Sequence, residues 1–146
     1  MRTIIDFDQL RYTNKVVFTN GCFDLLHYGH KFILTQSKSY GDYLIVGLNS
    51  DCSVKKLKGE SRPIQNQEIR RKKLLELPYV DSVIIFNEDT PRGLIELIKP
   101  HVLVKGGDYT IETIVGAKET IERGGEVKIV PIYGDYSTSK IILDMI

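Results

Sequence analysis

The chain has 146 residues, of which 42% are hydrophobic and 27% charged, and its formal net charge is +1. This length and balance are typical of one soluble globular domain, which we expect over residues 1–146, and they exclude collagen-like, largely disordered and repeat-array proteins. No apolar run approaches the roughly 18 residues of a membrane-spanning helix, and no secretory signal is evident. Two cysteines, Cys22 and Cys52, do not make a disulfide framework, so we expect a cytoplasmic protein without a membrane partner.

Short β-rich runs alternate along the chain with stretches of helical periodicity. The predicted strands are 16–19, 43–48, 82–86, 102–105 and 127–130. The predicted helices are 29–40, 67–77, 91–98 and 117–123, and a last helix begins at Ser137. The basic segment between the second strand and Pro63 is predicted to be a loop.

This alternation indicates βαβ units. The expected fold class is therefore α/β, with a mainly parallel five-stranded sheet that carries helices on both faces. Ligands of such sheets bind beyond the carboxyl ends of the strands, at the point where the strand order reverses. The residues that follow each strand are therefore the candidates for a functional site.

Positive charge is concentrated in residues 55–73, which hold eight Lys or Arg residues against two Glu. Two interpretations are open, a solvated helix face with an adjoining loop or a local anion site. Outside this segment there is no basic stripe, and the whole chain is nearly neutral. Both facts argue against a nucleic-acid partner.

The first predicted strand leads into the string Thr-Asn-Gly-Cys-Phe-Asp-Leu-Leu-His-Tyr-Gly-His at residues 19–30. His27 and His30 are three residues apart, so on a helical turn they face the same way, and Gly29 leaves room for a ligand. Imidazoles at a helix N-terminus suit phosphate oxygens, although two surface or packing histidines would show the same spacing. A zinc site is disfavoured because only His101 remains and the cysteines lack ligand spacing.

The string from Asn20 to Asp24, followed by His-Tyr-Gly-His, resembles the signature of the nucleotidyltransferase superfamily that is named for its HxGH motif. Members of this superfamily share a Rossmann-like α/β fold, and the resemblance covers nearly the whole chain after Lys15. Further matching segments are 49–51, 55–59, 61–63, 67–70, 88–91, 104–109 and 136–140. This succession resembles the adenylyltransferases that make ADP-heptose from heptose 1-phosphate, above all in Val-Lys-Gly-Gly-Asp-Tyr at 104–109.

A second branch of the superfamily is also similar. Residues 24–30 and 79–81 resemble glycerol-3-phosphate cytidylyltransferases, but Pro78 stands where that branch has an arginine. Residues 134–136 likewise lack the arginine that precedes its terminal Ser-Thr motif. We therefore expect ATP and heptose 1-phosphate as substrates, with CTP and a polyol phosphate as the alternative. The non-enzyme alternative is a nucleotide-binding regulatory module, against which the intact set of motif residues argues.

The resemblance implies that a phosphate oxygen of the sugar phosphate attacks the α-phosphorus of the nucleotide and that pyrophosphate leaves. Because the attacking group is already an anion, catalysis is mainly positioning and charge stabilisation. Mg²⁺ is the implied cofactor, bound through the nucleotide phosphates, since no direct metal motif is present. The implied partners are a second copy of the chain and a separate sugar kinase that supplies the substrate.

The resemblance also implies the site residues. The catalytic set is His27, His30, Lys55 and Arg70. The implied nucleotide- and sugar-binding set is Thr19, Asn20, Gly21, Phe23, Asp24, Gly29, Lys58, Lys105, Gly107, Asp108, Ser137 and Thr138.

Several of these roles leave alternatives open. Asp24 would orient the site or help to hold the metal, or it would cap the following helix. The lysines of segment 55–58 would lie on a loop that closes over the substrates, and the sequence leaves open which of them reaches the phosphates. Arg70 would bridge phosphates, whereas its basic neighbours would form a solvated helix face.

Overall fold

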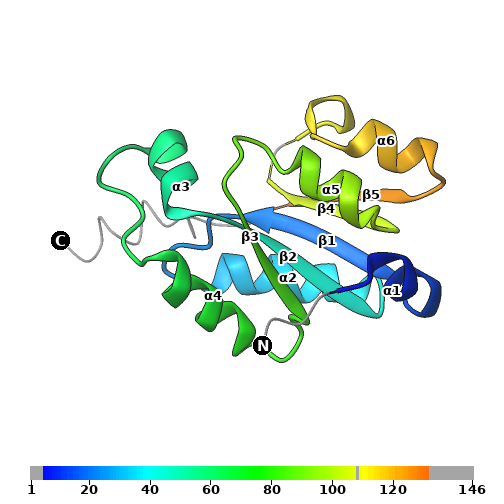
Figure 1. Cartoon of the computed structure of the whole chain (residues 1–146), viewed down its shortest axis with the longest axis horizontal. Helices are drawn as coiled ribbons and strands as arrows, with labels where there is room; N and C mark the ends of the chain where they lie inside the picture. Colours follow the sequence, from blue (N-terminus) through cyan, green and yellow to red (C-terminus); the bar gives the residue numbers. More distant parts are fainter. Residues whose placement is uncertain (1–4, 108, 132–146) are drawn as a thin grey trace.

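Five strands form one parallel sheet in the order β3-β2-β1-β4-β5 (Figure 1). The computed structural model describes residues 5–107 and 109–131. The strands are β1 (Val16–Gly21), β2 (Tyr43–Asn49), β3 (Ser82–Phe86), β4 (Val102–Gly106) and β5 (Glu126–Val130). The chain runs outward from β1 to β3 and then returns to the other side of β1, so the strand order reverses between β1 and β4. The predicted Rossmann-like α/β class is confirmed.

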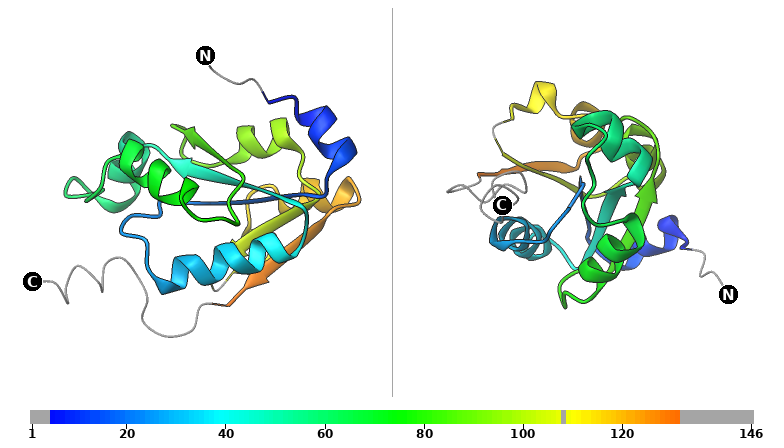
Figure 2. Two further views of the ribbon diagram at one scale, coloured as in Figure 1. Left: turned by 90° about the horizontal axis from the view of Figure 1, so that it is seen from below. Right: turned by 90° about the vertical axis from the view of Figure 1, so that its left-hand side faces the viewer.

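Helices cover both faces of this sheet (Figures 1 and 2). The helices are α1 (Phe7–Thr13), α2 (Tyr28–Ser39), α3 (Asp51–Lys58), α4 (Gln67–Leu75), α5 (Arg92–Ile98) and α6 (Ala117–Glu122), with a 3-10 turn η1 (Ile111–Thr113). Helices α2 and α4 lie on one face, and α1, α5 and α6 lie on the other. Among the described residues, no helix is long and apolar enough to cross a membrane.

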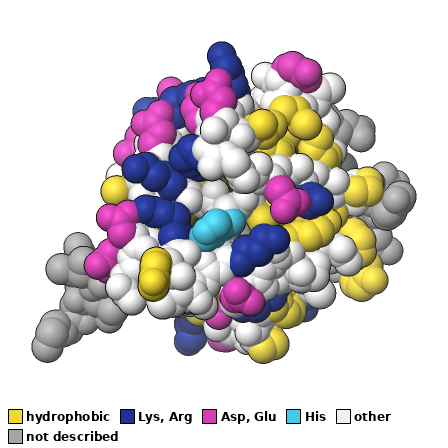
Figure 3. Space-filling model, turned by 90° about the vertical axis from the view of Figure 1, so that its right-hand side faces the viewer, with side chains coloured by type: hydrophobic (Ala, Val, Ile, Leu, Met, Phe, Trp, Pro, Cys, Tyr) yellow, Lys and Arg dark blue, Asp and Glu magenta, His cyan; other side chains and the backbone are white. Residues whose placement is uncertain are grey.

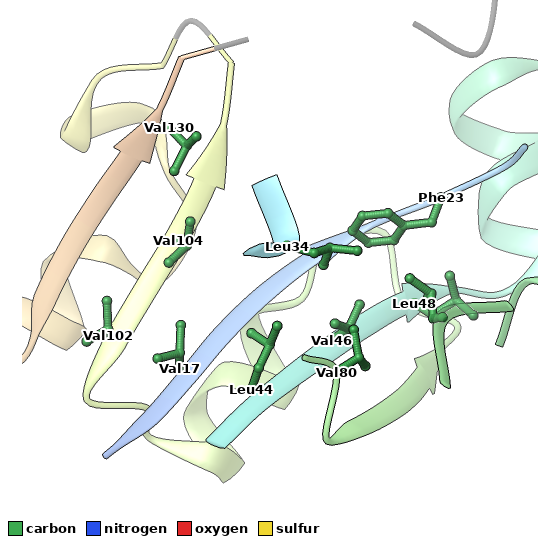
Figure 4. Close-up of a cluster of buried hydrophobic side chains, with 11 residues drawn as sticks. Val17, Phe23, Leu34, Leu44, Val46, Leu48, Val80, Val102, Val104 and Val130 are labelled. Atoms are coloured by element: carbon green, nitrogen blue, oxygen red, sulfur yellow. The ribbon is translucent and has the colours of Figure 1, made fainter. Parts of the chain in front are cut away.

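The core is divided by the sheet into two clusters because successive side chains of a strand point to opposite faces. In β1, Val17 belongs to the cluster beneath α2 and α4, whereas Val16 and Phe18 belong to the cluster beneath α5 and α6. Figure 4 shows the first cluster, where Leu34 of α2 lies over the valines and leucines of the strands. These near-continuous apolar strands are typical of a parallel sheet that is buried on both sides.

Helix α3 corrects the prediction of a loop before Pro63. Ser50 caps the helix, since its side chain accepts a hydrogen bond from the backbone N–H of Ser53 at 3.2 Å, and Val54 is fully buried. The last turn carries Lys55, Lys56 and Lys58, where positive charge favours the negative end of the helix dipole. The sequence of this short helix shows many basic residues and no clear apolar periodicity, because only one turn of the helix is buried.

Helix α1 was also not predicted. Asp6 caps it by accepting from the backbone N–H of Gln9, and Phe7 and Leu10 pack against the second cluster. The helix predicted to begin at Ser137 lies outside the described residues.

Candidate active site

A cavity of about 120 Å³ opens at the carboxyl ends of β1 and β4, where the strand order reverses. Its lining residues are Thr19, Asn20, Gly21, Cys22, Phe23, His30, Ile33, Lys58, Lys105 and Gly106. Seven of these ten were predicted as site residues from the sequence, and they come from three separate segments of the chain. The structure therefore brings the predicted residues together at the place where parallel sheets bind ligands.

The junction between β1 and β4 is fixed by direct contacts. The Thr19 hydroxyl, which is nearly fully buried, donates to the Val104 carbonyl at 3.0 Å. Gly106 lies so close to Ile33 of α2 that an added Cβ would be 2.4 Å from the Ile33 Cδ1 atom. Gly107 has a φ of 115°, which favours glycine, and its N–H donates to the Val130 carbonyl at 3.0 Å. These contacts hold the wall of the cavity that β4 forms.

The turn that joins β1 to α2 has an unusual backbone. Phe23 and Leu25 have φ values of 47° and 56°, in the left-handed region that non-glycine residues rarely adopt. The turn is held by packing, because Phe23 is buried and its ring meets the His30 ring edge-on at a centroid distance of 5.3 Å. The strained turn aims the chain so that α2 begins directly beside the cavity.

His27 and His30 form a stacked pair at the first turn of α2. Their ring centroids are 3.8 Å apart with an interplanar angle of 27°, which confirms that the two side chains face the same way. Nδ1 of His27 accepts from the backbone N–H of the buried Gly29 at 3.1 Å, and Nδ1 of His30 accepts from the backbone N–H of His27 at 3.4 Å. Each neutral ring must therefore carry its proton on Nε2, which makes Nε2 a hydrogen-bond donor.

Both histidines are held in the neutral form. Burial, together with the neighbouring His27 and Lys58, lowers the pKa of His30 to about 3. Burial also lowers the pKa of His27. Nε2 of His27 is buried and finds no hydrogen-bond partner among the described residues. A buried donor without a partner is costly, so this atom suits a ligand that offers an acceptor oxygen.

Arg70 has a different place from the one predicted. Its guanidinium is fully buried and donates to the carbonyls of Gln65, Cys22 and Asn49 at 2.8–2.9 Å and to the Asp51 carboxylate at 2.8 Å. These contacts leave it no exposed surface with which to bridge phosphates. In the structure the Arg70 side chain ties α4 to the ends of β1 and β2.

Asp24 is likewise committed to the protein. Its two carboxylate oxygens accept from the backbone N–H groups of Ile64 and Gln65 at 2.7 and 2.9 Å, and Arg62 lies 3.5 Å away. The side chain is buried and fastens the segment between α3 and α4 to the site. The alternative of a helix cap is wrong, because α2 is capped by His27.

Two lysines line the cavity. Lys58, at the end of α3, is one of them, whereas Lys55 and Lys56 of the same helix are exposed and are not among its lining residues. Lys105, at the end of β4, is half-buried, and burial lowers its pKa. Its Nζ lies 5.0 Å from the centre of the Tyr109 ring. Two lysines from separate elements thus bring positive charge to the cavity that His30 lines, whereas His27 is not among its lining residues.

A second cavity of about 140 Å³ adjoins the first, and the two share Asn20 and Lys105. Its other walls are largely apolar and come from Pro91, Leu103, Val104, Tyr109, Thr113, Ile114 and Val115. Sequence reasoning did not single out this set, although most of these residues follow β4 at the same edge of the sheet. Together the two cavities offer a polar, cationic half and a more apolar half.

The fit of a metal ion can be judged from the carboxylates. Among the described residues, no group of three His, Cys, Asp or Glu side chains could hold a metal, and both oxygens of Asp24 already accept hydrogen bonds. The residues present therefore fit a Mg²⁺ ion only if substrate phosphates and water supply most of its ligands, which is a common mode for this ion.

Three predicted site residues, Asp108, Ser137 and Thr138, lie outside the described residues. Cys22 lines the cavity, and burial raises the pKa of its thiol, which opposes a thiolate nucleophile. This environment suits a packing residue beside the site.

The strand order and the cavity at the switch point define a Rossmann-like α/β protein with a ligand site between β1 and β4. A family model described as cytidylyltransferase-like matches residues 18–143. The chain belongs to the cytidylyltransferase-like family.

Curated relatives carry a longer chain. The bifunctional protein HldE of Marinomonas sp. (strain MWYL1) is 56% identical over 128 residues, which are 88% of this chain and 27% of that protein. The bifunctional protein HldE of Geobacter metallireducens is 52% identical over 139 residues, or 95% of this chain and 28% of that protein. The chain thus spans about a quarter of the length of the curated relatives it matches.

Solved structures show the same fold. A lipopolysaccharide core biosynthesis protein from Thermoplasma volcanium superposes with a TM-score of 0.65 at 30% identity, covering 84% of this chain and 98% of that one. A pantoate-beta-alanine ligase from Francisella tularensis superposes with a TM-score of 0.58 at 16% identity, covering 89% of this chain and 65% of that one. The second likeness concerns the fold alone.

Proposed function

We propose that this chain transfers an adenylyl group from ATP to heptose 1-phosphate, forming ADP-heptose and pyrophosphate. The observation that carries the proposal is the pair of neutral, stacked histidines, of which His30 lines the switch-point cavity together with Lys58 and Lys105. The HldE relatives and the lipopolysaccharide core biosynthesis protein support the choice of the heptose branch.

In the proposed reaction, a phosphate oxygen of the sugar phosphate forms a bond to the α-phosphorus, and the bond from that phosphorus to the bridging oxygen breaks. Pyrophosphate carries away the electron pair of the broken bond. His27 and His30 donate hydrogen bonds to phosphate oxygens through Nε2, and Lys58 and Lys105 balance the charge of two approaching anions. The attacking phosphate oxygen is already negatively charged, so no proton needs to be removed from it and the reaction requires no strong base.

The other proposed roles follow from position. Thr19, Asn20, Gly21 and Phe23 all line the cavity. We assign Arg70 and Asp24 to positioning, because their side chains bind the protein and not the cavity. Mg²⁺, when bound to the triphosphate, would supply further charge neutralisation. Lys55, Gly107, Asp108, Ser137 and Thr138 remain proposed substrate contacts from the family resemblance.

The family model's description favours one alternative, a CTP-dependent transfer to glycerol 3-phosphate or a similar polyol phosphate. The side chains that line the two cavities do not distinguish one nucleotide base from another, because the amide of Asn20 can both donate and accept hydrogen bonds. The nucleotide preference is therefore a matter for measurement.

The test is pyrophosphate release with Mg²⁺ and each of ATP, CTP, GTP and UTP. Each nucleotide is offered with the two anomers of heptose 1-phosphate and with glycerol 3-phosphate. We expect release with ATP and one heptose anomer. Release only with CTP and glycerol 3-phosphate would establish the alternative, and nucleotide binding without release from any pair would indicate a regulatory module.

The proposal includes a homodimer, a cytoplasmic location and a separate sugar kinase that supplies heptose 1-phosphate. Its support is the family resemblance. Sedimentation of the purified chain tests the dimer, and a chain that remains monomeric at micromolar concentration would contradict it.

A further inference from the structure

A larger cavity lies at the opposite end of the sheet, beyond the amino ends of β1, β4 and β5. Its volume is about 350 Å³, which exceeds that of either cavity at the candidate active site and lies within the range of small-molecule sites. Its charged and titratable lining residues are Arg11, Lys15, Lys99, His101, Arg123 and Glu126. On the face that Figure 3 shows, Lys and Arg side chains lie on both sides of a histidine, with some Asp and Glu side chains among them.

His101 is fixed in one orientation at this cavity. Its Nδ1 accepts from the backbone N–H of Val16, the first residue of β1, at 2.9 Å. The neutral ring therefore carries its proton on Nε2, as the active-site histidines do. Burial lowers the pKa of His101, and the charges of Arg11 and Lys15 lower it further. The positive charges of Arg11 and Lys15, which oppose protonation of this ring, would attract an anion.

The single acidic lining residue does not cancel this charge. Glu126 is shared by two lysines, since Lys15 Nζ lies 3.7 Å from one carboxylate oxygen and Lys128 Nζ lies 3.2 Å from the other. The hydrogen bond from Lys128 is the main cause that lowers the pKa of Glu126. The Glu126 carboxylate therefore stays ionised and remains paired with the two lysines. Lys99 and Arg123 form no ion pair with any other residue in the described ranges.

The backbone shapes the wall on which these groups stand. Lys99 ends α5 with a φ of 51°, in the left-handed region. Gly125 packs closely against the residue that precedes β4, because an added Cβ would lie 2.8 Å from the His101 carbonyl oxygen. Arg11 is anchored by donation to the Ile98 carbonyl at 2.5 Å and by an ion pair with Asp8. The cationic groups thus surround a defined cavity instead of lying scattered on a surface.

We propose that this cavity is a second anion site, which binds a small phosphate-bearing molecule separately from the substrates of the active site. Phosphate oxygens require several N–H donors and positive charge, and His101 Nε2, Lys99 and Arg123 supply both. The cavity shares no lining residue with the two cavities at the carboxyl ends of the strands. The site does not depend on the proposed transferase activity.

The test uses the full chain and inorganic phosphate as the probe. Histidine side-chain NMR measures the pKa of His101 as phosphate replaces chloride at constant ionic strength. We expect the pKa of His101 to rise by about half a unit or more when phosphate binds. The test variant is Lys99→Asn with Arg123→Gln, because asparagine tolerates the left-handed backbone at position 99 and both side chains are exposed.

A matched control removes two exposed lysines of α4, Lys72→Gln with Lys73→Gln, and so changes the net charge equally. The control should keep the phosphate-dependent rise of the His101 pKa, and the test variant should lose it. The proposal is overturned if wild-type His101 does not respond, or if it responds equally in the test variant. The resonances of His27 and His30 report phosphate binding at the active site in the same spectra.

Discussion

In each of three histidines, Nδ1 accepts a hydrogen bond from a backbone N–H, so that the proton of the neutral ring is on Nε2. In His27 and His30 these hydrogen bonds lie at the first turn of α2, where they also cap the helix. Because a protonated Nδ1 could no longer accept, each of these bonds opposes the charged form, as burial does. The site therefore offers a triphosphate neutral hydrogen-bond donors from the histidines, and its positive charge comes from lysines.

Replacing His30 tests the role of these donors. We expect His30→Ala to lower kcat by about two to three orders of magnitude with a modest change in KM, because a donor that strengthens in the transition state is lost. His30→Asn, which keeps an N–H donor, should recover part of the rate. Steady-state pyrophosphate release measures both variants, and a folded His30→Ala protein with wild-type kcat would contradict the assignment.

The low pKa of His30 also predicts a pH dependence of stability. The pKa of this residue is about 3 in the folded chain, compared with about 6.5 when it is unfolded. Between these values the unfolded chain binds a proton that the folded chain does not, so the free energy of unfolding falls as the pH drops. For this one group the slope is at most about 1.4 kcal/mol per pH unit.

Denaturant unfolding of wild type and His30→Asn at pH 7, 6 and 5 measures this contribution, since the other titrating groups are common to both. We expect the variant to lose less stability over this interval. Equal losses would mean that His30 does not stay neutral in the folded chain.

At the scale of elements, the segment between α3 and α4 is fastened to the site by two buried charges. Asp24 holds its backbone N–H groups, and Arg70 binds carbonyls at the ends of β1 and β2. This clamp places Lys58 at the cavity, because Lys58 ends the helix that the segment follows. Asp24 and Arg70, whose side chains bind protein atoms, thus help to determine where the proposed phosphate ligand Lys58 lies.

Arg70→Met should therefore destabilise the chain by about 3 kcal/mol or more, because three backbone carbonyls, that of Asn49 buried and the other two partly buried, and the Asp51 carboxylate lose their donor. Arg71→Met is the matched control. Its side chain is exposed on the same helix, so the expected change is within about 0.5 kcal/mol. Denaturant unfolding compares the two, and similar values for both would contradict the positioning role.

The sheet and the HxGH turn could be predicted from the sequence because each strand is an apolar run with clear boundaries and the two histidines have a fixed spacing. Helix α3 could not, since its apolar face is short and its charge resembles that of a loop. The burial of Arg70 and the left-handed Phe23 depend on contacts between distant segments. Periodicity does not report such contacts, so the sequence did not indicate that the Arg70 side chain is buried among backbone carbonyls.

At the scale of the whole molecule, the parallel sheet gives the protein two chemically different ends. The carboxyl ends of β1 and β4 carry the histidine pair and the two adjoining cavities. The amino ends carry the larger cationic cavity around His101. The strands join these ends through a core that is buried on both faces, so a ligand at one end does not compete for space with a ligand at the other.

The proposed reaction requires that His27 and His30 bind the nucleotide phosphates through Nε2. Histidine side-chain NMR with Mg²⁺ and a non-hydrolysable α,β-methylene ATP tests it most directly. We predict that the Nε2 resonances of both histidines shift on binding and that the pKa of His30 rises from about 3, because phosphate charge favours the protonated ring. Tight calorimetric binding of the nucleotide with both histidines unchanged would contradict the account.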